Sequence, residues 1–228
     1  MEYLHNGFAL ELCEGAFPLS TDSIALGGFV RLPKQAKVLD LGAGCGTLGL
    51  LLCAKDTGCS VTGVEIDENA HRTALRNGEV NQLSARLTSI CADLRTVPSF
   101  ISPGSFHCCV SNPPYFSAEQ VSANSVARHE QLCSLDDLFA AAGWAVRYGG
   151  DFFLVHKPER LAELCACATA HKLEPKRLQL LRHKASDPIS LILLQCRKGA
   201  KSGLVIEEAY LQEQDGTPSE YYRRLYHI

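Results

Sequence analysis

Strand-like apolar runs alternate with segments of helical periodicity along most of this chain. Buried strands are predicted by the runs at residues 37–41, 61–65, 87–91 and 106–111. The first two runs are followed by residues 47–55 and 69–81, which predict helices. A strand, a helix and another strand in this order predict right-handed crossovers between parallel strands. The pattern therefore predicts an α/β protein with a doubly wound, mostly parallel sheet.

A further helix is predicted by its own capping signal. Ser134 can cap it while Asp137 returns a hydrogen bond to the cap residue. One buried stripe at helical spacing then follows, made of Leu135, Leu138, Phe139, Ala142 and Val146. We expect the pair Gly149 and Gly150 to end this helix. Residues 152–155 then predict a strand that is buried on both faces, and Pro158 is expected to open another helix.

In the last third of the chain, predicted strands follow one another without a helix between them. Residues 178–181 and 189–194 predict two strands joined by a turn at 186–188, so we expect them to pair antiparallel at one edge of the sheet. Residues 204–206 are a candidate for one further edge strand. The aromatic and basic stretch 221–226 is compatible with helix packing or with nucleic-acid contact, and the area that aromatic side chains bury favours packing.

Composition places the chain among water-soluble globular proteins. Its 228 residues allow one large domain or two small ones, and 46% of them are hydrophobic. No run reaches the roughly 20 apolar residues of a membrane span, and the N-terminus lacks a signal-peptide pattern, so we expect a cytoplasmic protein. The 11 cysteines are odd in number and many lie in apolar runs, which favours buried reduced thiols over disulfides. Cys165 and Cys167 are too close on a predicted helix to share a face, so no metal site is expected.

Charge is distributed unevenly although the formal net charge is only −3. Between residues 172 and 201 only Glu174 and Asp187 are acidic. The basic residues of this stretch are Lys172, Lys176, Arg177, Arg182, Lys184, Arg197, Lys198 and Lys201. A local basic face can hold a phosphate backbone, and a solvated surface explains the same residues equally well. Under the first interpretation, Lys176, Arg177 and Arg182 are candidate RNA contacts.

A glycine-rich turn lies between the first strand and the first helix. Gly42, Gly44 and Gly46 leave room for backbone amides to approach a nucleoside cofactor near the positive end of a helix. In the dinucleotide-binding fingerprint the third glycine would fall at Thr47, so the spacing differs from that motif. Glu65 ends the second strand, where a carboxylate can accept both ribose hydroxyls of NAD or of S-adenosylmethionine.

The turn formed by Asn112, Pro113, Pro114 and Tyr115 follows the fourth strand. A conjugated exocyclic amine is a poor nucleophile because its lone pair is delocalised. The Asn112 side-chain oxygen and the Pro113 carbonyl can accept its two hydrogens and aim the lone pair at a methyl group. The prolines fix the turn, and Tyr115 can stack on the target ring. Methyl transfer needs alignment more than acid–base help, so no general base is expected. Asn-Pro also marks ordinary turns, which is the alternative interpretation.

Residues 116–131 are polar and lack a clear period, which is typical of a substrate loop at the mouth of a site. Arg128 and His129 lie near the end of this loop. A contact with a substrate phosphate and an ordinary solvated pair are both compatible with their position.

Taken together, these motifs resemble the class I S-adenosylmethionine-dependent methyltransferases. The resemblance covers residues 17–197 and is greatest to the bacterial enzymes that modify adenine N6 at position 37 of a valine tRNA. It implies a seven-stranded sheet with one antiparallel strand. Further cofactor contacts implied by it are Thr21, Asp40, Asp93 and Asn112, with Asp93 on the adenine amino group and Asp40 near the methionine amine or orienting the loop. Implied substrate contacts are Phe116, Arg128 and His129.

The resemblance also implies an organisation and a set of rivals. Residues 1–36 would pack over the cofactor site, 37–200 would form the methyltransferase core and 201–228 would extend it. The expected partner is RNA, namely tRNA, with no membrane and no obligate protein partner. A glutamine methyltransferase of release factors uses the same turn but normally carries an N-terminal helical domain, for which 36 residues leave no room. DNA adenine or ribosomal guanine methyltransferases, an inactive cofactor-binding scaffold and an NAD-dependent oxidoreductase are the remaining alternatives.

Overall fold

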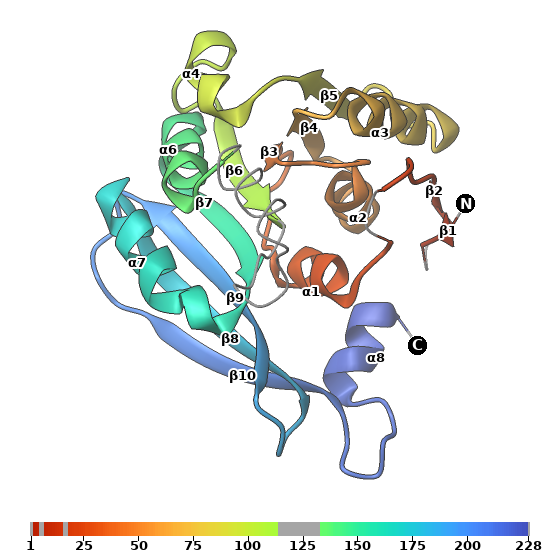
Figure 1. The fold of residues 1–228 in the computed structure, drawn as a ribbon, viewed down its shortest axis with the longest axis vertical. Coiled ribbons are helices and arrows are strands. Elements are labelled where there is room, and N and C mark those ends of the chain that lie inside the picture. Colours follow the sequence, from red (N-terminus) through yellow and green to blue (C-terminus); the bar gives the residue numbers. More distant parts are fainter. Residues whose placement is uncertain (1, 5–6, 16–17, 114–132, 228) are drawn as a thin grey trace.

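The computed structural model describes residues 2–4, 7–15, 18–113 and 133–227. Helices pack on both faces of one large sheet (Figure 1). The strands are β1 Glu2–Tyr3, β2 Ala9–Leu10, β3 Lys37–Leu41, β4 Ser60–Glu65, β5 Leu87–Cys91, β6 Phe106–Ser111, β7 Val146–His156, β8 Leu173–Lys184, β9 Ile189–Lys198 and β10 Val205–Gln212. The helices are α1 Thr21–Phe29, α2 Thr47–Lys55, α3 Glu68–Val80, α4 Val97–Phe100, α6 Leu135–Ala145, α7 Leu161–Ala170 and α8 Glu220–Tyr226, with short 3₁₀ turns at Leu94–Thr96 and Pro158–Arg160.

The large sheet has eight strands in the order β10-β8-β9-β7-β6-β3-β4-β5. All neighbours are parallel except β9, which runs antiparallel to β7 and β8. The predicted α/β class and the single antiparallel strand are confirmed. The strand count of seven is one too low, because β10 adds to the edge beside β8. Because β9 runs antiparallel to β8, it brings the chain back to the end of the sheet where β8 begins. The next strand, β10, can therefore pair parallel to β8 without a crossover helix.

Alternate residues of the central strands face two hydrophobic cores. Phe153 of β7 packs edge-on against Phe29 of α1, with ring centroids 6.2 Å apart. Its neighbour Phe152 points to the opposite face and packs edge-on against Phe139 of α6 at 5.2 Å. The two cores are therefore built by α1, α2 and α8 on one face and by α6 and α7 on the other. All eleven cysteines are free.

The boundary between α6 and β7 differs from the prediction. Ser134 and Asp137 form the expected capping box, but the helix ends at Ala145 and Val146 already begins β7. The two glycines serve the strand instead of ending the helix. A Cβ at Gly150 would lie 2.6 Å from the carbonyl oxygen of His107, so only glycine lets β7 pass this close to β6.

The C-terminal segment is ordered by packing. Residues 220–226 form α8, where the rings of Tyr222 and Tyr226 stack 4.2 Å apart. Leu225 is buried against α1, which confirms the prediction that this stretch packs as a helix. Within the described ranges, no helix has the length and apolar character needed to cross a membrane.

Candidate active site

The two predicted motifs lie at the same edge of the sheet. β3 and β6 are adjacent and parallel, with Asp40 opposite Val110 in register. The glycine loop follows β3 and Asn112 follows β6, so both emerge where these strands end. The carboxyl ends of parallel strands are where α/β sheets bind their ligands. The glycine loop and the Asn112 turn therefore open on the same side of the sheet.

The glycine loop adopts a conformation that side chains disfavour. Gly42, Gly44 and Gly46 have φ angles of +74°, +54° and +83°. A Cβ at Gly42 or Gly44 would meet no atom within 4 Å, so the loop leaves open space beside its backbone. At Gly46 a Cβ would lie 3.2 Å from that of Ala74, which brings the start of α2 close to α3. Open space beside a strand-to-helix turn is what a nucleoside cofactor requires.

Glu65 joins this loop to the end of β4. Its Oε2 accepts a hydrogen bond from the Gly44 amide at 2.8 Å, and its Oε1 accepts one from the Asp67 amide at 2.9 Å. The side chain is thereby held at the rim of a small cavity. That cavity is lined by Gly42, Val64, Glu65, Ile66, Ala92, Asp93, Leu94 and Cys133. The structure thus brings together three of the predicted cofactor residues, Gly42, Glu65 and Asp93.

Asp93 lies just beyond β5 and caps the short turn that follows. Asp93 forms an ion pair with Arg95. Hydrogen bonds donated by the Arg95 side chain hold the pKa of Asp93 below its usual value. The carboxylate therefore carries a negative charge at neutral pH and can accept a hydrogen bond from an amino group. Its proposed contact with the adenine amino group stays a prediction.

Asp40 is the most unusual group of the site. Its side chain is 1% exposed, and neither carboxylate oxygen has a hydrogen-bond partner among the described residues. Burial, and secondly the charge of Glu65, raise the pKa of Asp40 to about 8. A buried carboxylate without a partner is unfavourable by several kcal/mol unless a positive group neutralises it. Its position two residues before Gly42 fits a ligand that brings a positive charge, as S-adenosylmethionine does.

Asn112 is held from the other side of the site by α1. Its Nδ2 donates a hydrogen bond to Ser23 Oγ at 2.9 Å, and Ser23 is buried. Ser20 caps this first turn of α1 by accepting from the Ser23 amide. Donation through Nδ2 defines which end of the amide carries the oxygen, and that oxygen is the acceptor required for an incoming amine. The sequence prediction missed Ser23, although Thr21 in the same helical turn is a predicted cofactor contact.

Thr21 also lies at the start of α1, where its hydroxyl is 3.3 Å from that of Tyr226. This contact ties the first turn of α1 to α8. Pro113 lies within the described residues. The other predicted residues of the turn and loop lie outside them, namely Pro114, Tyr115, Phe116, Arg128 and His129.

The predicted RNA contacts at 176–182 are not brought together. Arg177 is buried and lies over the Phe29 ring at 3.7 Å. Its guanidinium donates to the Phe29 carbonyl and to Gln195, and its Nε is 3.3 Å from Glu207. Arg177 therefore joins β8 to α1, and its burial does not support the prediction that it contacts RNA.

The two remaining cations of that set lie at different ends of β8. Lys176 is near its start and donates to the Lys201 carbonyl, whereas Arg182 is near its end and donates to the Asp187 carbonyl. They are six positions apart along the strand, which separates them by about 20 Å. They cannot act as one compact phosphate contact.

Comparison with known proteins places this site in context. A family model described as methyltransferase small domain matches residues 26–164. A tRNA1(Val) (adenine(37)-N6)-methyltransferase of Aeromonas hydrophila is 30% identical over 215 residues, which cover 92% of this chain and 89% of the relative. A protein of the same name from Bacteroides fragilis is 26% identical over 220 residues, covering 92% of each chain.

Solved structures agree on the fold. A protein of Agrobacterium tumefaciens described as a predicted O-methyltransferase matches with a TM-score of 0.77 and 21% identity, over 91% of this chain and 96% of its own. Geranyl diphosphate C-methyltransferase of Streptomyces coelicolor, in complex with S-adenosyl-L-homocysteine, matches with a TM-score of 0.56 and 10% identity over 77% and 76% of the two chains.

Proposed function

This chain belongs to the methyltransferase small domain family and is similar to tRNA1(Val) (adenine(37)-N6)-methyltransferases, and we propose that it methylates N6 of an adenine in the anticodon loop of a tRNA, at position 37. It is an S-adenosylmethionine-dependent N-methyltransferase. A base in a single-stranded loop can leave its stack at low cost and enter a pocket, which suits the anticodon loop as a substrate.

The observation that carries the proposal is that β3 and β6 are adjacent and parallel, so that their carboxyl ends lie side by side. The predicted cofactor residues lie at the ends of β3, β4 and β5, and Asn112 lies at the end of β6 beside them. S-adenosylmethionine supplies, when bound, a methyl group on a positively charged sulfur. Asp40 would neutralise positive charge of the cofactor, Glu65 would accept from its ribose hydroxyls, and the Gly42–Gly46 backbone leaves the space it needs.

In this proposal, the residues after β6 bind and orient the amino group that accepts the methyl group. The Asn112 oxygen and the Pro113 carbonyl would each accept one hydrogen of the exocyclic amino group. Ser23 holds the Asn112 amide so that its nitrogen points toward α1. Alignment of this kind provides most of the acceleration for transfer of an already activated methyl group, and the surplus proton of the product is lost to water.

The proposal is tested by incubating tRNA that lacks this modification with the protein and isotope-labelled S-adenosylmethionine. Nucleoside mass spectrometry should detect labelled N6-methyladenosine, and fragment mapping should locate it at position 37. The matched control is Asn112→Ala. Label on a glutamine of a peptide release factor, with none on tRNA, would instead establish the rival activity and overturn the proposal.

A further inference from the structure

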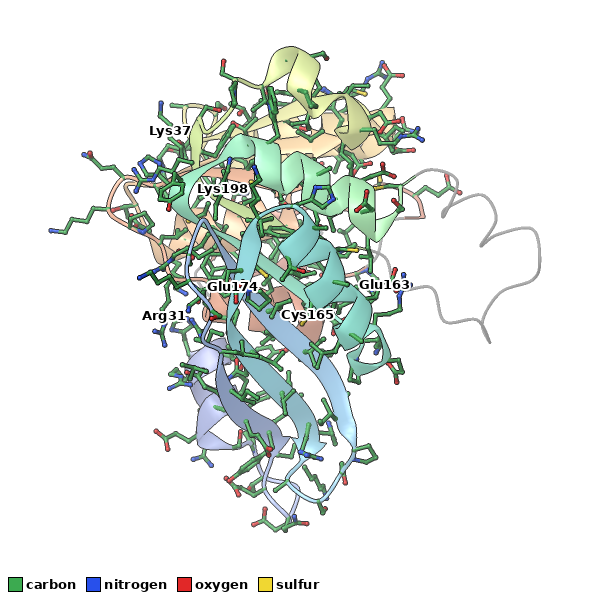
Figure 2. The ribbon with its side chains drawn as sticks, turned by 90° about the vertical axis from the view of Figure 1, so that its left-hand side faces the viewer. Arg31, Lys37, Glu163, Cys165, Glu174 and Lys198 are labelled. Atoms are coloured by element: carbon green, nitrogen blue, oxygen red, sulfur yellow. The ribbon has the colours of Figure 1, made fainter. Side chains whose placement is uncertain are left out.

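The end of the sheet where the parallel strands begin lies opposite the candidate active site and carries a surplus of positive charge. Five cations lie where the parallel strands begin and β9 ends, and we call them the basic edge: Arg31, Lys37, Arg147, Arg197 and Lys198. Carboxylates beside them on β7 and β8 are Asp151 and Glu174, both of which face Arg197 in strand register. In a chain of net charge −3 this is a marked local excess. Arg31 and Lys37 lie along one margin of the molecule (Figure 2).

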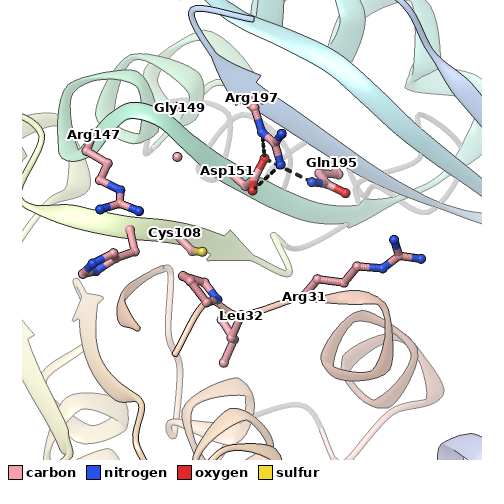
Figure 3. Close-up of a pocket in the computed structure, with 11 residues that line it drawn as sticks. Arg31, Leu32, Cys108, Arg147, Gly149, Asp151, Gln195 and Arg197 are labelled. Carbon is pink, nitrogen blue, oxygen red and sulfur yellow. Dashed lines mark hydrogen bonds and ion pairs between the residues drawn. The ribbon is translucent and has the colours of Figure 1, made fainter. Parts of the chain in front are cut away.

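A polar cavity of about 390 Å³ opens within the basic edge. Arg147 and Arg197 line it from β7 and β9, and Arg31 lines it from the connection between α1 and β3, with its side chain extending away from Arg147 (Figure 3). Asp151 is neutralised by Arg197 at 2.9 Å and also accepts from Gln195 at 3.0 Å. Neither Arg31 nor Arg147 forms an ion pair within the described residues.

His107 does not offset this charge. Its Nδ1 accepts a hydrogen bond from the Lys37 amide at 3.0 Å. Burial, followed by the charges of Arg147 and Lys37, lowers the pKa of His107, so the ring is neutral at pH 7. The cavity therefore combines a surplus of two guanidinium charges with a volume in the range of small-ligand sites.

An exposed aromatic ring belongs to Tyr148, which lies in the chain between two residues that line the cavity, Arg147 and Gly149. Tyr148 is 80% exposed, although it is among the largest side chains of the protein. Its hydroxyl is 3.0 Å from the Gly199 carbonyl, to which it donates, and its ring covers Gly199 so closely that a Cβ there would lie 2.1 Å from a ring carbon. The ring is thus fixed in one place at small entropic cost and still open to a stacking partner.

Guanidinium groups beside a fixed, exposed aromatic ring are the combination that binds single-stranded nucleic acid. We propose that the basic edge binds a single-stranded segment of RNA, with backbone phosphates at Arg31 and Arg147 and a base stacked on Tyr148. Because β6 is six residues long, this surface lies about 20 Å from the methyl-transfer edge. The segment bound here is therefore distinct from the nucleotide that is methylated. The inference goes beyond the proposed function and does not require it.

The test is fluorescence anisotropy with a labelled single-stranded RNA of about ten nucleotides at several salt concentrations. Arg147→Glu should weaken binding about tenfold and lower the slope of log K against log salt by about 1 to 2. Tyr148→Ala should weaken binding about tenfold with the slope unchanged, and Tyr148→Trp should restore it. Arg72→Glu is the control, because it makes the same charge change at an exposed ion pair on α3.

Equal binding by Arg147→Glu, Tyr148→Ala and Arg72→Glu would overturn the proposal. So would competition by adenosine monophosphate at the same concentration as the RNA, since that result would identify a mononucleotide site. Thermal unfolding of each variant separates misfolding from lost contacts. The two proposals fail separately: binding that depends on Tyr148 without any methylated tRNA refutes only the proposed function, and methylation with variant-independent binding refutes only this inference.

Discussion

Replacing Asp40 by asparagine should stabilise the ligand-free protein at neutral pH. The substitution keeps the shape of the side chain and removes a carboxyl group that is buried without a partner among the described residues. The pKa of Asp40 is about 8 in the folded protein, against 3.8 for an ordinary aspartate. Between these values the folded state keeps a proton that the unfolded state releases, so the free energy of unfolding falls as pH rises. Above about pH 8 the carboxyl group is ionised in the folded state as well, so the free energy of unfolding falls no further on its account.

The size of the effect follows from the same two values. The interval from 3.8 to pH 7 is 3.2 pH units, and each unit corresponds to about 1.36 kcal/mol. Asp40→Asn should therefore raise the free energy of unfolding by about 4 kcal/mol at pH 7. At pH 4, close to the unfolded-state pKa of 3.8, the carboxyl group keeps its proton in the folded state and is about half protonated in the unfolded state, so the two proteins should differ in stability by less than about 1 kcal/mol.

Urea unfolding followed by circular dichroism at a series of pH values between 4 and 8 measures this difference. Taking wild type minus variant cancels the titration of all other groups. Asp22→Asn is the control, because Asp22 is only partly buried in the first turn of α1, and it should change stability by less than about 1 kcal/mol. A difference for Asp40→Asn that does not vary with pH, or a variant less stable than wild type at pH 7, would refute the reasoning.

Four further substitutions probe the Ser23–Asn112 hydrogen bond, the predicted ribose contact and the packing of Arg177. Asn112→Ala should reduce methyl-transfer turnover by about 10²–10³-fold with cofactor affinity near normal in calorimetric titration, and an equal loss of affinity would argue against its role. Ser23→Ala should lower turnover in wild type but not further in Asn112→Ala, whereas additive losses would show an independent effect. Glu65→Ala should weaken cofactor binding, and unchanged affinity would count against a ribose contact. Arg177→Ala should destabilise the protein by about 2–4 kcal/mol in urea unfolding, and a change below about 0.5 kcal/mol would contradict its structural role.

The half of the sheet formed by β3, β4, β5 and β6 could be predicted because these strands are short and apolar and are bounded by helices or turns. β3, β5 and β6 begin and end at the predicted residues. The α6 boundary could not be predicted in this way, because Gly149 and Gly150 read as a helix stop. What they provide is the close approach of β7 to β6, and that contact is tertiary.

For the site, too, local features could be predicted and tertiary contacts could not. Gly42, Glu65 and Asp93 could be placed from their positions at strand ends, since those ends converge in a parallel sheet. The Ser23–Asn112 hydrogen bond joins residues 89 apart, and nothing local to either segment predicts it. Arg177 looked like a surface charge within a basic stretch, but the aromatic ring and carbonyl of Phe29 hold it inside.

The claim that an exocyclic amine is the methyl acceptor can be tested with two anticodon stem–loop RNAs. One carries adenine at position 37 and the other carries purine, which lacks the N6 amino group. Transfer of label from S-adenosylmethionine should occur with adenine and be absent with purine. Equal labelling of both RNAs, or labelling of neither, would contradict the account.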